Sequence, residues 1–263
     1  MIRLSREVRA SIGQGVEPGP VRNAWAGWPT AALVSPYLIA RVTVSGMPDP
    51  VSGYLCDIKV LDAWVSETVL PVLESMVEGI SPRGTLATAI LSIGSKLMQS
   101  APANTTWEEL ELFVSPYLRF SVQKERIEMV RLTEQFEFSA AHRLHASEWS
   151  DEQNLQSFGK CNNPNGHGHN YVVDVTIEGH PEPESGMLLP LGRLEEIVQQ
   201  ELIKRFDHKH LNVDTAEFQR QNPSVENIAR VAWKLLEGKL SPARLARVRV
   251  YETAKTWVDY EGE

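Results

Sequence analysis

The sequence predicts an α+β protein of two tandem units, each with the order β-β-α-α-β-β around an antiparallel sheet. Two observations predict this fold: an internal repeat, and the same order of strand-like and helix-like segments in both halves. A length of 263 residues is enough for two domains of ordinary size. We place the boundary near residue 127, which gives units 1–127 and 128–263.

The internal repeat relates residues 42–73 to residues 175–206 without a gap. Ten of these 32 positions are identical, and both copies contain the pattern G-x-P-x-P-x-S-G. Any strand–turn–helix unit could look similar, but the shared spacing of glycine, proline and serine favours a duplication. We therefore expect one fold in both halves.

The first half begins with two segments of strand-like alternation and ends with two more. Between them lie two segments whose apolar residues recur at helical spacing. The predicted elements are strands 6–12 and 37–46, helices 58–76 and 85–99, and a closing hairpin of 109–115 and 117–123.

The second half shows the same succession. Residues 133–144 and 171–179 predict strands, and the segment 180–186 between strand and helix is rich in Pro and Gly. The predicted helices are 191–206 and 223–240, the second with Ser224 as a plausible N-cap. Residues 244–262 predict the closing hairpin.

The overall composition excludes several classes of function. The net charge is −8, which argues against a nucleic-acid partner or an anionic membrane surface. No apolar run approaches the ~20 residues of a membrane span, so we expect no membrane association. Two cysteines, Cys56 and Cys161, offer no disulfide framework and favour a cytoplasmic location.

All seven histidines lie between His142 and His210. His167 and His169 are two residues apart at the start of a predicted strand, so their side chains share one face. His142 ends another predicted strand that could pair beside it. Three imidazoles with an open fourth position are typical of catalytic zinc, although other divalent ions also fit. The alternative is three surface histidines.

Cys161 lies six residues before His167, in a wholly polar stretch that could fold back toward a metal. A nearby divalent ion would favour the thiolate. The alternative is a buried small side chain.

Asp207 and His208 could form a carboxylate–imidazole pair, although an Asp-His step also occurs at helix ends. Glu252 could hold an N–H/NH₂ edge with both oxygens, but a surface glutamate is the simpler interpretation when it is taken alone. We expect His210 to be solvated.

Six motifs in this order, FSAAHRLH, FGKCNNPNGHGHNY, SGM, DHKHLN, VENIA and VYET, resemble the 6-pyruvoyl-tetrahydropterin synthase and 6-carboxytetrahydropterin synthase family. The resemblance covers residues 136–263 and implies the tunnelling fold (T-fold). It also implies a role for each matching position: zinc ligation by His142, His167 and His169, proton transfer by Cys161, relay by Asp207 and His208, and pterin anchoring by Glu252.

The resemblance implies 7,8-dihydroneopterin triphosphate as the substrate, with loss of triphosphate giving 6-pyruvoyl-tetrahydropterin. The alternative product is 6-carboxy-tetrahydropterin, formed with acetaldehyde in the queuosine branch. That branch typically has C-x3-HGH, whereas this chain has C-x5-HGH. A lesser alternative is a non-catalytic pterin-binding or zinc-binding protein.

The first half lacks the reactive residues. In the repeat, His167 and His169 correspond to Val34 and Pro36. The first half therefore looks like a degenerate copy. Members of the family assemble such units into barrels with active sites between them, which implies a homo-oligomer in which this half replaces a subunit.

Overall fold

The computed structural model describes residues 1–13, 16, 23–25, 27, 34–77 and 85–263. The chain forms two compact units. Unit 1 comprises Met1–Leu132 and Gly179–Leu188, and unit 2 comprises Thr133–Glu178 and Leu189–Glu263. The segment Gly179–Leu188, which follows the second strand of the second half, thus belongs to unit 1.

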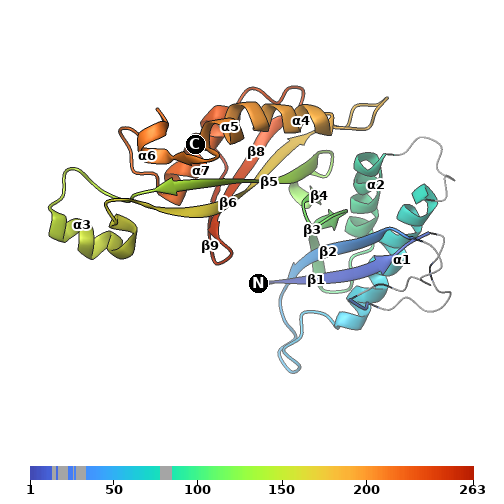
Figure 1. Cartoon of the computed structure of the whole chain (residues 1–263). Helices are drawn as coiled ribbons and strands as arrows, with labels where there is room; N and C mark the ends of the chain where they lie inside the picture. The colour runs from blue at the N-terminus through green and yellow to red at the C-terminus, as the bar shows by residue number, and fades with distance from the viewer. Residues whose placement is uncertain (14–15, 17–22, 26, 28–33, 78–84) are drawn as a thin grey trace. The chain divides into compact units, whose positions relative to one another are not determined.

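Unit 1 contains an antiparallel sheet with two helices packed against it (Figure 1). Alternate residues of its second strand, Ala40, Val42 and Val44, are buried. Its strands pair in sequence order: β1 (Ile2–Ser11), β2 (Tyr37–Gly46), β3 (Thr105–Phe113) and β4 (Leu118–Gln123), followed by the short helix η1 (Lys124–Arg126). Helix α1 (Ile58–Val77) packs on β1 and β2, and α2 (Leu86–Gln99) packs on β3 and β4.

Unit 2 has the same arrangement with additions. Its strand order is β5 (Val130–His142), β6 (His167–Gly179), β8 (Arg244–Thr253) and β9 (Thr256–Tyr260), and β7 (Lys209–His210) pairs in parallel with β5. The pairs β6–β8 and β8–β9 are antiparallel. One helical run comprises α4 (Leu191–Val198), the π-helix η3 (Gln199–Ile203) and α5 (Lys204–Phe206). Helix α7 (Val225–Leu236) packs on β8 and β9.

The structure confirms the α+β class and the β-β-α-α-β-β order in both halves. Four small helices of the described chain were not predicted: η1, α3 (Asp151–Phe158), η2 (Gly159–Asn162) and α6 (Leu211–Asp214). The sequence contains a signal for α3, because Ser150 and Gln153 form a capping box. Among the described helices, none combines the length and apolar character that a membrane crossing requires.

The predicted repeat has a structural counterpart at the same offset of 133 positions. The second strand ends, the first long helix begins, and the sheet register shifts at corresponding residues of the two halves. The corresponding pairs are Gly46 and Gly179, Ile58 and Leu191, and the register shifts at Thr43/Val44 and Thr176/Ile177. A shared strand irregularity is a detailed feature of a backbone, so its recurrence supports duplication.

Candidate active site

One face of β6 carries buried apolar side chains toward the end of the strand and the polar side chains of the site at its start. Val173, Val175 and Ile177 on this face are fully buried. Toward the start of the strand the same face carries Tyr171 and then His169 and His167, because side chains two apart point the same way. The packing that orders the core therefore also fixes the two histidines.

His142 reaches the same place from the end of β5. The residues two and four before it, Ala140 and Phe138, are buried on the same face. Phe138 stacks on Tyr171 with ring centroids 5.0 Å apart, which ties the two strands together beneath the histidines. His142 itself is fully buried.

The three histidines form a cluster suited to a metal ion. One ligand nitrogen from each of His142, His167 and His169 lies within 4.8 Å of the others. The Nε2 atoms of His142 and His167 are 3.1 Å apart. His169 Nε2 is buried without a hydrogen-bond partner in the described structure. A divalent cation would satisfy all three nitrogens, so the donor set fits zinc.

The surroundings of His142 and His167 favour the neutral form that metals bind. Burial, with smaller effects from the neighbouring histidines, lowers the pKa of His142 to about 4. Burial and His169 also lower the pKa of His167. His142 Nδ1 lies 2.7 Å from the Pro223 carbonyl, to which it donates as Nδ1–H, leaving the Nε2 lone pair toward the cluster. Neutral imidazoles bind the metal without first losing a proton.

Glu252 lies beside this cluster, near the end of β8. Its Oε1 atom is 3.5 Å from His142 Nε2 and 3.7 Å from His169 Nε2. The side chain is only 19% exposed. Sequence reasoning selected Glu252, but only the fold brings it within reach of the histidines.

Cys161 is held in η2, the short helix that follows α3. Its carbonyl accepts a hydrogen bond from Leu144 N at 2.9 Å, and the thiol is half-buried. Burial, then the charge of Glu252 and then that of Cys161, raise the pKa of Tyr171. The thiol therefore lies within electrostatic range of the Tyr171 hydroxyl.

Gly166 allows the loop between Cys161 and His167 to pass close to β5. Its φ of +72° lies in the region that glycine adopts easily. A Cβ there would lie 2.9 Å from the His142 carbonyl oxygen and 2.7 Å from His210 Nε2. A larger residue would push the loop away from the histidines.

Asp207 and His208 contact each other after the helical run ends. Asp207 Oδ2 lies 2.8 Å from His208 Nδ1, and Oδ1 accepts a hydrogen bond from Ser139 N at 2.9 Å. That backbone bond, followed by the bond from His208, lowers the pKa of Asp207. His208 has φ +56° and a side chain that is 83% exposed.

The Asp207–His208 pair is not joined to the thiol within the chain. Among the described residues, no hydrogen bond or ion pair links Cys161 to either of them. His208 instead lines an open pocket of about 580 Å³ that also reaches His169. The structure therefore brings together His142, His167, His169 and Glu252, with Cys161 nearby, and leaves His208 exposed.

Two further residues contribute to the site. Tyr171 was missed, although the spacing H-x-H-x-Y places it on the face of the two histidines; its hydroxyl is buried and has no partner in the described structure. The prediction that His210 is solvated is wrong. Pairing of β7 with β5 half-buries His210, and its ring lies against Gly166.

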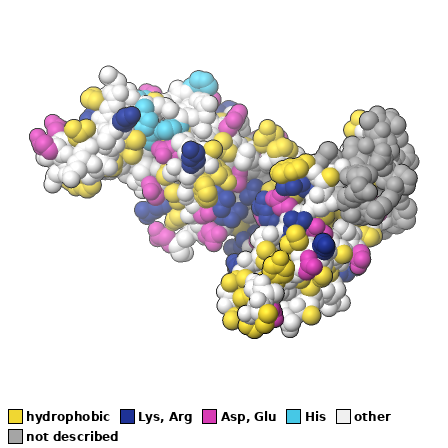
Figure 2. Space-filling model, turned by 90° about the horizontal axis from the view of Figure 1, so that it is seen from below, with side chains coloured by type: hydrophobic (Ala, Val, Ile, Leu, Met, Phe, Trp, Pro, Cys, Tyr) yellow, Lys and Arg dark blue, Asp and Glu magenta, His cyan; other side chains and the backbone are white. Residues whose placement is uncertain are grey.

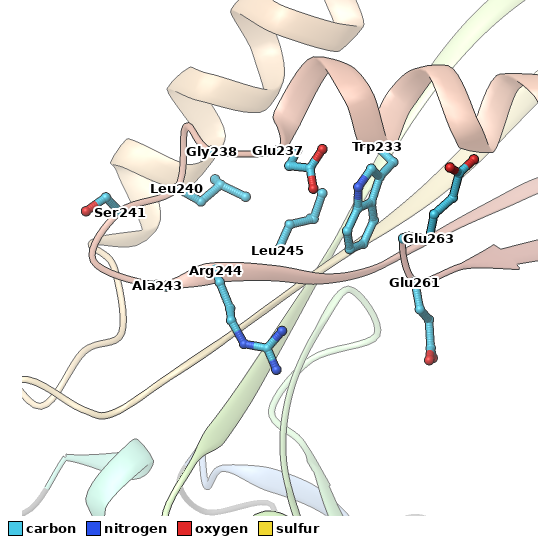
Figure 3. Close-up of a pocket in the computed structure, with 11 residues that line it drawn as sticks. Trp233, Glu237, Gly238, Leu240, Ser241, Ala243, Arg244, Leu245, Glu261 and Glu263 are labelled. Atoms are coloured by element: carbon cyan, nitrogen blue, oxygen red, sulfur yellow. The ribbon is translucent and has the colours of Figure 1, made fainter.

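Histidine side chains gather on one part of the surface shown in Figure 2. A second pocket, of about 450 Å³, lies between the end of α7 and the start of β8 (Figure 3). Trp233, Arg244 and Glu261 are among its lining residues, which include none of the predicted site residues. The histidine cluster therefore remains the candidate active site.

Comparison with known proteins matches the second half of the chain to one family. Residues 131–263 match the family described as 6-pyruvoyl tetrahydropterin synthase. The 6-pyruvoyl tetrahydrobiopterin synthase of Homo sapiens is 42% identical over 133 residues, 51% of this chain and 92% of the human protein. The 6-carboxy-5,6,7,8-tetrahydropterin synthase of Rickettsia conorii is 26% identical over 149 residues, 50% of this chain and 99% of that protein.

A solved structure of Caenorhabditis elegans 6-pyruvoyl tetrahydropterin synthase is 38% identical, covering 51% of this chain and 96% of that one, with a TM-score of 0.49. The fold and the site define an α+β protein with a three-histidine cluster that could hold a metal ion. The chain belongs to the 6-pyruvoyl tetrahydropterin synthase family, through its second half.

Proposed function

We propose that this protein is a zinc-dependent lyase that converts 7,8-dihydroneopterin triphosphate to 6-pyruvoyl-tetrahydropterin, with loss of triphosphate. The observation that carries the proposal is the three-histidine cluster with Glu252 beside it and Cys161 nearby. It occurs in a sequence 42% identical to the human 6-pyruvoyl tetrahydrobiopterin synthase. We propose a cytoplasmic enzyme with a small-molecule substrate.

Each residue has a proposed role. Zinc held by His142, His167 and His169 would polarise the oxygens of the substrate side chain. The thiolate of Cys161 removes a proton from that side chain, after which the triphosphate leaves and the side chain tautomerises. Glu252 accepts hydrogen bonds from the N–H/NH₂ edge of the pterin ring.

Asp207 and His208 act as the proton relay in this proposal. Asp207 fixes the tautomer of His208 and stabilises its protonated form. The exposed ring of His208 is suited to a pocket that a neighbouring unit completes.

The first half is proposed to be a degenerate T-fold unit without a metal centre, which completes an oligomeric barrel in place of a subunit. Its first strand, β1, lies at an edge of the sheet, and an open edge needs a partner. If residues 128–263 alone gave the same homo-oligomer and the same turnover, this role would be wrong.

Product analysis tests the proposed reaction. Zinc-loaded protein is incubated with 7,8-dihydroneopterin triphosphate, and the pterin product is identified by mass, with Cys161→Ala as the control. We expect the pyruvoyl product from the wild type only. A carboxy product with acetaldehyde would assign the queuosine-type reaction, and zinc binding without any turnover would indicate a non-catalytic protein.

A further inference from the structure

The Pro- and Gly-rich turns of the two repeats have the same internal structure. The first turn is residues 47–55, and the second turn is residues 180–188, at the offset of 133 positions. Each turn is closed by the same set of hydrogen bonds. In the first turn, Asp49 N donates to Tyr54 O (2.8 Å), Gly53 N to Asp49 O (2.9 Å) and Tyr54 N to Ser52 Oγ (3.3 Å). In the second turn, Glu182 N donates to Met187 O (3.0 Å), Gly186 N to Glu182 O (2.6 Å) and Met187 N to Ser185 Oγ (3.3 Å).

The second turn is docked within unit 1. Thr85, the N-cap of α2, donates its hydroxyl to the Gly186 carbonyl at 2.9 Å. Gly186 is buried, and a Cβ on it would overlap the Thr85 side chain. The turn therefore fits this helix N-terminus only because position 186 is glycine.

The first turn has no such partner in the described part of the chain. A Cβ on Gly53 would have no heavy atom within 4 Å. Tyr54, which corresponds to the half-buried Met187, is 67% exposed. In Figure 1 this turn is part of the light-blue loop between β2 and α1. A surface that is covered in one repeat is thus uncovered in the other.

The matching helix N-terminus lies in unit 2. Ser224 caps α7 as Thr85 caps α2: its Oγ accepts a hydrogen bond from Asn227 N at 3.5 Å, and Thr85 Oγ1 accepts one from Thr88 N at 3.4 Å. Thr85 also donates its hydroxyl, whereas Ser224 donates to no acceptor within the described residues. Ser224 is half-buried and can still be reached.

We propose that the first turn of one copy of this chain docks on the N-terminus of α7 in a second copy. Gly53 lies against Ser224 as Gly186 lies against Thr85, and the Ser224 hydroxyl donates to the Gly53 carbonyl. The occupant is a second copy because the first turn has the internal bonds and the glycine that the docked turn uses.

The docked turn adjoins the candidate metal centre. Pro223, the residue before Ser224, provides the carbonyl that accepts the hydrogen bond from His142 Nδ1 at 2.7 Å. A second copy therefore shields the bond that orients this histidine, and the degenerate half contributes to the surroundings of the site in another chain.

Two variants in the first turn test the proposal by sedimentation velocity of the full-length protein. In Gly53→Asn, asparagine tolerates the φ of +73°, and the space around Gly53 accepts it in the single chain. In the docked turn it would overlap Ser224. We expect the assembly to dissociate to smaller species at concentrations at least about tenfold higher than for the wild type.

The matched control is Val51→Glu. Val51 corresponds to Glu184, which is exposed in the docked second turn, so this change should leave the assembly intact. A monomeric wild type, a Gly53→Asn variant that assembles like the wild type, or equal dissociation of both variants would overturn the proposal.

A second measurement does not depend on the folding of a variant at Gly53. A photoreactive phenylalanine analogue replaces Tyr54, and isotopically heavy and light chains are mixed before irradiation. We expect mixed heavy–light cross-links to the start of α7, at residues 222–228. Cross-links confined to one chain, or to another surface, would refute the docking.

Discussion

The two repeats have the same backbone pattern but differ in what precedes their second strand. Tyr37, where β2 begins, corresponds to Asn170, yet β6 begins earlier, at His167. Both metal-ligand candidates of β6 lie in this extension. The core of the repeat therefore maintains the fold, while a short extension beyond the core carries the metal-ligand candidates.

A second contrast lies between the first strand and the first long helix of each half. In unit 1, Arg6 forms a two-armed ion pair with Asp62 at 2.7 Å. Asp62 corresponds to Glu195, which in unit 2 lies beside another carboxylate, Glu134. The contact between the first strand and the first long helix is thus made by an acid–base pair in unit 1 and by two acidic side chains in unit 2.

The largest expected effect is the loss of turnover when the thiol, which only the second repeat places at the site, is removed. In Cys161→Ala we expect turnover of 7,8-dihydroneopterin triphosphate to fall by roughly 10³-fold, because the proposed proton acceptor is lost. Zinc content should stay unchanged. Cys56→Ser, in unit 1, is the control, and an equal loss of turnover there would contradict the assignment.

Giving the second repeat the residue of the first should abolish the metal centre. His167→Val introduces the residue found at position 34, and we expect zinc affinity to fall by roughly 100-fold or more. Competition with a chromogenic chelator measures this. His180→Gln, which alters an exposed histidine outside the cluster, should retain wild-type affinity; wild-type affinity in His167→Val would rule out this site.

The like-charge pair should make unit 2 sensitive to pH. Burial, with a smaller effect of Glu195, raises the pKa of Glu134 to about 7. The native state therefore holds a proton that the unfolded chain releases above pH 4.5, so the free energy of unfolding falls between pH 4.5 and 7. Because the side chain is partly exposed, we expect Glu134→Gln to stabilise the protein at pH 8 by only about 1 kcal/mol.

Urea unfolding at pH 5 and pH 8 measures this effect. The gain from Glu134→Gln should be smaller at pH 5, where Glu134 is protonated in the native state. A gain independent of pH would show that Glu134 is not the group responsible.

The smallest effect is expected from the ion pair of unit 1. Asp62→Asn removes the charge opposite Arg6, in a pair that is partly exposed to solvent. We expect a loss of about 0.5–1 kcal/mol in the free energy of unfolding at neutral pH. The same urea measurements test it, and a loss clearly larger than the Glu134→Gln gain would show that the opposite-charge pair matters more than the like-charge pair.

The fold was predictable where local periodicity determines it, as in β2 with its alternating buried residues. Helix α3 was missed because it is short and polar, and only its capping box marks it. The H-x-H spacing predicted two members of the cluster. The approach of Glu252, the buried Tyr171 hydroxyl and the separation of His208 from Cys161 depend on tertiary packing, which no local pattern encodes.

The location of every histidine in the second half has a consequence for stoichiometry. One peptide chain joins a second half that carries the three-histidine cluster to a first half that has no histidine in its sequence. Any assembly of intact chains must then contain histidine-bearing and histidine-free halves in equal number. A calorimetric titration should saturate this site at one zinc ion per chain, whatever the number of chains in the assembly.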